Sequence, residues 1–86
     1  MDPRVVLYSR AGCHLCDDAR AVVADVAGRA GTDWHEVDVD GDPALAAALG
    51  ELVPVVEVDG VRQGYWRIDP QRLRRALASG SARPLP

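Results

Sequence analysis

The chain has 86 residues, of which 48% are hydrophobic and 27% are charged, and its formal net charge at pH 7 is −3. A chain of this length has enough apolar surface for one core only, so we expect a single domain. The mild acidity excludes a basic nucleic-acid surface, and no apolar run approaches the roughly 18 residues that a membrane-spanning helix needs.

The first half of the chain predicts a strand, a helix and a second strand. Residues 4–8 form a continuous apolar run, typical of a strand that is buried on both faces. From residue 15 onward apolar side chains recur at helical spacing, and the glycines that follow offer places for this helix to end. Residues 33–40 alternate, with Val37 and Val39 on one face, which predicts a strand.

The second half predicts a short helix, a hairpin and a last helix. An Asp-Pro pair at residues 42–43 and another at residues 69–70 are typical of helix starts, since the aspartate caps the helix and proline fits its first turn. The first of these helices should run through Leu49, with Gly50 as its end. Between the two helices, β-rich runs flank Asp-Gly at residues 59–60, a dipeptide that favours a two-residue hairpin turn.

These elements predict an α/β fold in which the order β-α-β-α-β-β-α builds a four-stranded mixed sheet flanked by helices. The first two strands are joined by a helix and should be parallel, whereas the last two form an antiparallel hairpin. We expect one domain over residues 1–79, a frayed C-terminal tail over residues 80–86, and a monomeric protein.

The two cysteines lie where the first strand gives way to the first helix, in the stretch Cys13-His14-Leu15-Cys16. A helix N-terminus stabilises an anion through its unpaired N–H groups and its dipole, which favours a thiolate at Cys13. Arg10 and His14 are expected to favour the same thiolate, whereas the charges of Asp17 and Asp18 oppose it. Cys16 lies one turn further along on nearly the same face, so it can attack a mixed disulfide on Cys13 and close an intramolecular disulfide.

The cellular compartment in which the protein is expected indicates what kind of chemistry Cys13 and Cys16 carry out. The N-terminal segment has no apolar run of the signal-peptide kind, so we expect a cytoplasmic protein, and lasting structural disulfides are rare there. The pair then favours thiol redox chemistry. Two alternatives stay open: a metal or iron–sulfur site, with His14, His35 or a second chain supplying further ligands, and two inert buried thiols.

Further motifs add a resemblance to a known family. A strand followed by "GCHLC" at a helix start, Val53-Pro54 before the third strand and a hairpin ending near Gly64 resemble the glutaredoxin-like proteins of the thioredoxin superfamily. The stretches "CHLCDDA" and "YWRID" are most similar to its small bacterial glutaredoxin-like subfamily. The resemblance implies a thioredoxin-like fold and a thiol–disulfide oxidoreductase. In that enzyme Cys13 is the nucleophile, Cys16 resolves, and a cis Pro54 packs against them while the Val53 backbone pairs with the substrate.

The resemblance also implies a substrate site. Arg10 matches the family's basic residue ahead of the first cysteine, and Gly64 matches the first glycine of its late Gly-Gly-x-Asp motif. The chain departs from that motif at Tyr65 and Arg67, which replace the second glycine and the aspartate. Trp66 and Tyr65 could line a substrate groove beside Cys13, and for Trp66 we expect packing instead. The residues implied in substrate binding are Arg10, His14, Val53, Pro54, Gly64 and Tyr65.

The resemblance implies no permanently bound cofactor. Reducing equivalents would come from glutathione, another low-molecular-weight thiol or a protein reductase. The substrate would be a disulfide of a protein or of a small thiol, and neither nucleic acid nor a membrane is expected as a partner. Tyr65 is bulkier than the glycine of the family's glutathione motif, and Arg67 has the opposite charge to its aspartate. A further alternative is therefore a protein that exchanges disulfides with other proteins only and does not bind glutathione.

Overall fold

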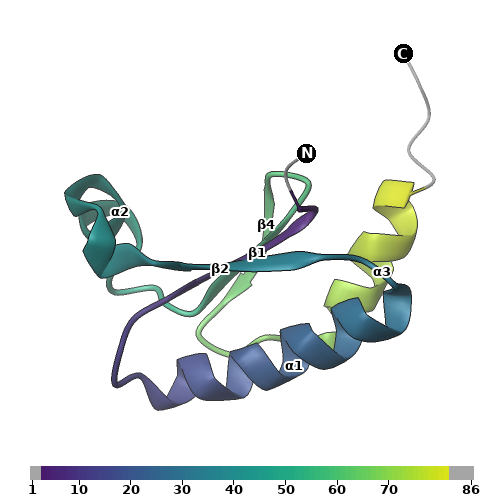
Figure 1. Ribbon diagram of the computed structural model, residues 1–86, viewed down its shortest axis with the longest axis horizontal. Helices are drawn as coiled ribbons and strands as arrows, with labels where there is room; N and C mark the ends of the chain where they lie inside the picture. Colours follow the sequence, from purple (N-terminus) through teal and green to yellow (C-terminus); the bar gives the residue numbers. More distant parts are fainter. Residues whose placement is uncertain (1–2, 82–86) are drawn as a thin grey trace.

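A computed structural model describes residues 3–81 of the chain, which form one sheet with helices packed on it (Figure 1). The predicted order β-α-β-α-β-β-α is confirmed, with one short 3-10 turn (η1) added after the second strand. The elements are β1 (Val5–Ser9), α1 (His14–Ala30), β2 (Trp34–Asp38), η1 (Val39–Gly41), α2 (Pro43–Leu49), β3 (Val55–Val58), β4 (Val61–Tyr65) and α3 (Pro70–Ser81).

The sheet is mixed, as predicted, and its strand order is β2-β1-β3-β4. Strand β1 pairs in parallel with β2 and antiparallel with β3, and β3 pairs antiparallel with β4. The register sets Leu7 of β1 between Glu36 of β2 and Val56 of β3. The ends of β1 and β2 that follow Ser9 and Asp38 therefore lie together at one edge, next to the start of α1.

Two apolar clusters form the core. The larger cluster lies between one face of the sheet and helices α1 and α3, which pack against each other on that side (Figure 1). The smaller cluster lies near the start of α1 and combines Cys16 with side chains from η1, α2 and β3. The buried members of the larger cluster are Val5, Leu7, Ala19, Val23, Val26, Val56, Val58, Leu73 and Leu77, and those of the smaller cluster are Cys16, Val39, Leu49, Val53 and Val55.

The prediction that the first strand is buried on both faces is wrong in part. Val5 and Leu7 are wholly buried against the larger cluster, whereas Val6 and Tyr8 on the opposite face are only half-buried. The reason is that α1 and α3 both cover the same face, while the short α2 lies at one end of the sheet (Figure 1).

The second strand ends two residues earlier than its alternating pattern predicts. The Asp38 carboxylate accepts a 2.9 Å hydrogen bond from the Asp40 N–H, which turns the chain out of the extended conformation into η1. Val39 is therefore not on a strand face with Val37 but is buried in the smaller cluster.

Capping and turn residues act as predicted. The Asp42 and Asp69 carboxylates each accept a 2.9 Å hydrogen bond from the N–H two residues later, at the starts of α2 and α3. Asp59 and Gly60 have φ angles of 54° and 82°, the left-handed conformation that a type I′ hairpin turn requires. Helix α3 reaches Ser81, so it includes the first residues of the predicted tail, and residues 82–86 lie outside the described part of the chain.

Candidate active site

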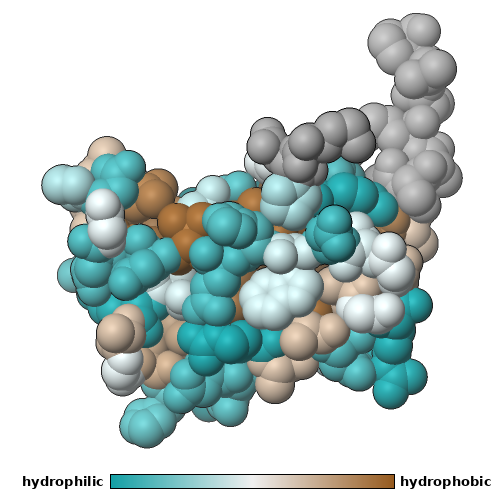
Figure 2. Space-filling model, in the orientation of Figure 1, coloured by the Kyte–Doolittle hydropathy of each residue, from teal (hydrophilic) through white to brown (hydrophobic). Residues whose placement is uncertain are grey.

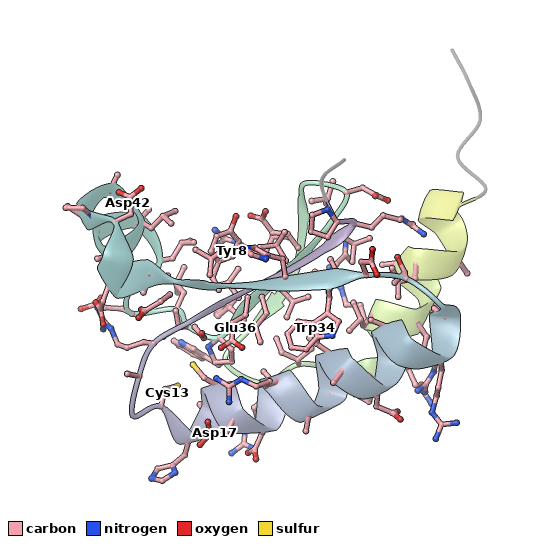
Figure 3. The ribbon with its side chains drawn as sticks, viewed as in Figure 1. Tyr8, Cys13, Asp17, Trp34, Glu36 and Asp42 are labelled. Atoms are coloured by element: carbon pink, nitrogen blue, oxygen red, sulfur yellow. The ribbon has the colours of Figure 1, made fainter. Side chains whose placement is uncertain are left out.

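The first thiol serves as the N-cap of α1. Cys13 has extended backbone angles, and its Sγ accepts a 3.1 Å hydrogen bond from the Cys16 N–H, where a serine or aspartate oxygen usually lies. The preceding Gly12 has a φ of 75°, which lets the chain turn sharply from the loop into the helix. Cys13 is half-buried and lies at the front of α1 below the sheet (Figure 3).

The second thiol lies inside the molecule. Cys16 is 0% exposed, and the pKa of its thiol is raised to about 11, chiefly by burial and then by its hydrogen bond with Cys13. A backbone hydrogen bond from Arg10 and the charge of Arg20 act in the opposite direction. The two neighbouring thiols therefore differ in access to solvent and in environment.

The loop before β3, which contains Val53 and Pro54, packs against the two cysteines. The Val53–Pro54 peptide bond is cis, as the family resemblance implies, and Pro54 is buried. Val53 belongs to the smaller cluster with Cys16, and Cys13 packs against that cluster. The Val53 N–H donates a 3.1 Å hydrogen bond to the Leu49 carbonyl, so pairing of this N–H with a substrate would require that bond to be exchanged.

A groove of about 490 Å³ runs beside the thiols and is lined by Leu15, Glu51, Val53, Tyr65, Trp66 and Arg67. The expectation that Trp66 serves in packing is wrong, because its side chain lines this groove and is 51% exposed. Its backbone has a φ of 62°, rare for a bulky residue, and its N–H donates a 2.9 Å hydrogen bond to the Pro54 carbonyl. Its ring N–H donates to the Glu51 carbonyl at 3.0 Å, so one backbone and one side-chain hydrogen bond hold Trp66 to the cis-proline loop.

Of the residues in and just after β4, Tyr65 and Arg67 line this groove and Gly64 does not. Tyr65 lines it and packs edge-to-face on Trp66, with ring centroids 5.1 Å apart. Gly64 is half-buried in β4 opposite Val56. Arg67, where the family motif has an acidic residue, lines the groove as well. The departures from the family motif therefore lie on the surface beside the thiols, where they affect what can bind.

The two basic residues predicted beside the thiols lie in different settings. The Arg10 guanidinium forms a two-pronged ion pair with Asp40, at 2.9 and 3.0 Å, and donates a 3.1 Å hydrogen bond to the Gly50 carbonyl. Asp40 raises the pKa of Arg10, and a substrate carboxylate would have to compete with it. His14 is exposed on the first turn of α1.

A polar network that sequence reasoning missed links α1 to β2 beside the buried thiol. Arg20 Nε and Nη2 donate to the two Glu36 carboxylate oxygens at 2.8 and 2.7 Å, and its Nη1 donates to Asp17 at 2.9 Å. The Ser9 hydroxyl donates to Glu36 at 2.6 Å. In Figure 3 the Glu36 side chain extends from β2 toward α1, where Asp17 lies on an early turn. The alternating sequence of β2 does not show which side chains Glu36 meets, because its partners come from α1 and β1.

The described residues bring together no group of three or more His, Cys, Asp or Glu side chains that could hold a metal ion. His35 is exposed on β2. A metal or iron–sulfur site built on Cys13 and Cys16 would therefore need ligands from outside residues 3–81 of one chain. Over the same residues, no helix has the length and apolar character to cross a membrane.

Comparisons with known proteins agree on one family. The profile of the family described as "Glutaredoxin-like domain (DUF836)" matches residues 4–78. An uncharacterized protein of Mycobacterium tuberculosis is 38% identical over 81 residues, covering 88% of this chain and 84% of its own. A crystal structure of a structural-genomics target from X. campestris is 40% identical with a TM-score of 0.69, covering 93% of this chain and 99% of that one.

Solved glutaredoxins share the fold at lower identity. The solution structure of a Brucella melitensis glutaredoxin is 25% identical with a TM-score of 0.58, covering 91% of this chain and 84% of that one. A buckwheat glutaredoxin–glutathione complex is 19% identical with a TM-score of 0.64, covering 93% and 81%, which is a likeness of fold alone. These similarities confirm the thioredoxin-like fold and the resemblance drawn from the motifs.

Proposed function

Because the chain belongs to the glutaredoxin-like domain family, we propose that it is a thiol–disulfide oxidoreductase in which Cys13 attacks the substrate and Cys16 resolves the intermediate. The difference between the two thiols is the observation that carries this proposal. Cys13 is half-buried at a helix N-cap, where its sulfur accepts a hydrogen bond from the Cys16 N–H. Cys16 is wholly buried with a pKa of about 11, so external reagents are kept from it while the Cys13 sulfur lies beside it.

The reaction balances over two thiol exchanges. The Cys13 thiolate attacks one sulfur of a substrate disulfide, forms a mixed disulfide and releases the other sulfur as a thiolate, which takes up a proton. Cys16 then loses its proton and attacks the Cys13 sulfur, which forms the Cys13–Cys16 disulfide and releases the second substrate thiolate, protonated in turn. The substrate gains two electrons and two protons, and two equivalents of an external thiol, or a protein reductase, return them to the enzyme.

The groove beside the thiols supports a disulfide-containing protein as substrate. Its lining combines apolar side chains of Leu15, Val53 and Trp66 with the opposite charges of Glu51 and Arg67. An extended peptide segment can place an apolar side chain against the first group and a charged one against the second. We propose glutathione, another low-molecular-weight thiol or a protein reductase as the source of electrons, no permanently bound cofactor, and action as a cytoplasmic monomer.

A redox titration of the metal-free protein in glutathione buffers, read by intact mass, tests the proposal. We expect a reversible loss of two hydrogens as Cys13 and Cys16 form their disulfide. A glutathione adduct on the Cys16→Ser variant would support glutathione as reductant, and a disulfide without an adduct would favour a protein reductase or a different small thiol. If no disulfide forms across the whole range, the proposed function is wrong.

The two single variants separate the roles of the thiols. Cys13→Ser should abolish reductase turnover, because the attacking sulfur is gone. Cys16→Ser should accumulate the mixed disulfide on Cys13, because nothing resolves it. Circular dichroism spectra that match the parent protein would control for folding. Full turnover in Cys13→Ser would contradict the assignment.

A further inference from the structure

Arg20 lies one helical turn beyond the buried thiol. Residues four apart on a helix have Cβ atoms about 5–6 Å from each other, so Arg20 and Cys16 are neighbours along α1. Cys16 is 0% exposed, whereas the Arg20 side chain is 41% exposed. A positive charge therefore lies at the border between the buried sulfur and solvent.

The guanidinium is held in one orientation. Two of its three nitrogens donate to Glu36 and the third donates to Asp17, at distances between 2.7 and 2.9 Å. The Glu36 carboxylate is fixed in turn by the hydroxyl of Ser9, a residue that is only 4% exposed at the end of β1. Arg20 lowers the pKa of Glu36, so this carboxylate is ionised at neutral pH. A network from three elements thus holds the charge of Arg20 in place.

The other side chains packed around Cys16 are apolar or already engaged. Val39, Leu49, Val53 and Val55 from η1, α2, the cis-proline loop and β3 are buried with it, with Leu45 and Leu52 packed alongside. The thiol of Cys13 also packs there and raises the pKa of Cys16, and the Cys13→Ser background of the experiment below removes it. The Tyr8 hydroxyl of β1, at the edge of this cluster, donates to Glu57 at 3.4 Å. The Arg10 side chain is bound to Asp40, so Arg10 reaches Cys16 through its backbone.

We propose that Arg20 is a positioning residue for the resolving step, in which its fixed charge stabilises the thiolate of Cys16. This inference rests on the proposed function. To attack the mixed disulfide, the buried thiol must lose its proton in a setting where water does not stabilise the anion. The charge of Arg20, which is 41% exposed and so partly screened by water, offsets part of that cost. In the Glu36→Gln variant the amide oxygen and Asp17 can still accept hydrogen bonds from Arg20, so its charge stays beside Cys16.

The sign of the effect separates this role from a structural one. Arg20→Gln removes the positive charge and leaves Glu36 and Asp17 uncompensated, so the pKa of Cys16 should rise. Glu36→Gln removes a negative charge and leaves that of Arg20, so the same pKa should fall. A merely structural contribution would loosen the packing around Cys16 in both variants and move its reactivity in one direction.

The experiment measures alkylation of Cys16 by iodoacetamide as a function of pH in the Cys13→Ser background, where it is the one remaining thiol. Arg20→Gln should move the profile to higher pH by about half a unit, which slows alkylation at pH 8 about threefold, and Glu36→Gln should move it to lower pH. Arg20→Lys, which keeps the charge, should recover most of the parent profile. Arg29→Gln is the matched control, since Arg29 pairs with Asp25 further along the same helix, at 2.8 Å, and should leave the profile unchanged.

Shifts in the same direction for Arg20→Gln and Glu36→Gln, or no shift in either, would overturn the proposal. Faster alkylation in Arg20→Gln together with a lower melting temperature would also overturn it, because that result means exposure of Cys16 and not a change in its charge environment. The measurement needs no turnover. A failure of the proposed oxidoreductase function would instead appear as the absence of a Cys13–Cys16 disulfide in the redox titration.

Discussion

The two apolar clusters of this protein are built from similar side chains but enclosed in different ways. The larger cluster lies between the sheet and two full helices, α1 and α3, and all of its buried members are aliphatic. The smaller cluster is enclosed by η1, the seven-residue α2 and the cis-proline loop, and it contains a thiol. In Figure 2 apolar side chains reach the surface beside α2, on a face that is otherwise largely hydrophilic.

Helix α1 contributes buried side chains to both clusters, so burial along it affects both the stability of the fold and the pKa of a thiol. Ala19, Val23 and Val26 of α1 belong to the larger cluster, whereas Cys16, one turn nearer its start, belongs to the smaller one. Burial of the valines contributes to the free energy of unfolding. Burial of Cys16 raises the pKa of its thiol and hides it from solvent. The same physical effect therefore stabilises the fold at one end of the helix and sets thiol reactivity at the other.

The sharpest test of this separation is Leu73→Ala in the larger cluster. Leu73 is 1% exposed, and truncation of such a leucine leaves a cavity that lowers the free energy of unfolding by about 3 kcal/mol. Urea denaturation should measure this loss. The pH profile of Cys16 alkylation should stay unchanged, because Leu73 lies outside the smaller cluster, and a shifted profile would contradict the separation.

Leu49→Ala makes the same truncation in the smaller cluster. Leu49 is 7% exposed and sits at the end of α2, which can collapse onto the space left, so we expect a smaller loss of about 2 kcal/mol. Burial is the main cause of the raised pKa of Cys16, so water admitted beside it should lower that pKa from about 11. Alkylation in the Cys13→Ser background, with Leu73→Ala as the control, checks this; an unchanged profile would count against it.

Glu36→Gln tests, through pH, the network of Arg20, Glu36 and Ser9 beside the smaller cluster. Arg20 and Ser9 lower the pKa of Glu36 in the folded protein. Its stabilising contribution is therefore complete above the ordinary carboxyl pKa of about 4.3 and is lost as the pH falls through the lower folded value. At pH 7 the variant should lose about 1–2 kcal/mol in its free energy of unfolding. Urea midpoints of parent and variant should converge toward pH 3, and a gap that stays constant would contradict this account.

The smallest expected effect compares the two aspartate caps. Asp42→Ala at α2 and Asp69→Ala at α3 each remove one capping hydrogen bond and should each lower the free energy of unfolding by about 1 kcal/mol. Because α2 closes the smaller cluster, Asp42→Ala should also raise the alkylation rate of Cys16 by favouring local opening. Asp69→Ala should leave that rate unchanged. Equal rates in the two variants would mean that α2 does not control access to the thiol.

Local sequence patterns predicted most of the fold. The Asp-Pro pairs placed the starts of α2 and α3, and Asp59-Gly60 placed the hairpin turn, because each depends on hydrogen bonds or backbone angles within a few residues. The short spacing of Cys13 and Cys16 at a strand–helix junction was enough to bring the two sulfurs together. The cis bond before Pro54 came from the family resemblance and not from local chemistry.

The sequence by itself thus determined the elements, their order and the neighbouring thiols. The tertiary structure alone decided that Arg20 meets Glu36, that Arg10 is taken up by Asp40, and that Trp66 lines the groove. The first two contacts join residues 16 and 30 positions apart and depend on how β2 and η1 lie against the start of α1. The place of Trp66 depends on hydrogen bonds to the loop 15 residues before it. The periodicity of a sequence indicates which face of a helix or strand a side chain occupies. Which residues of other elements contact that face depends on how the elements pack together.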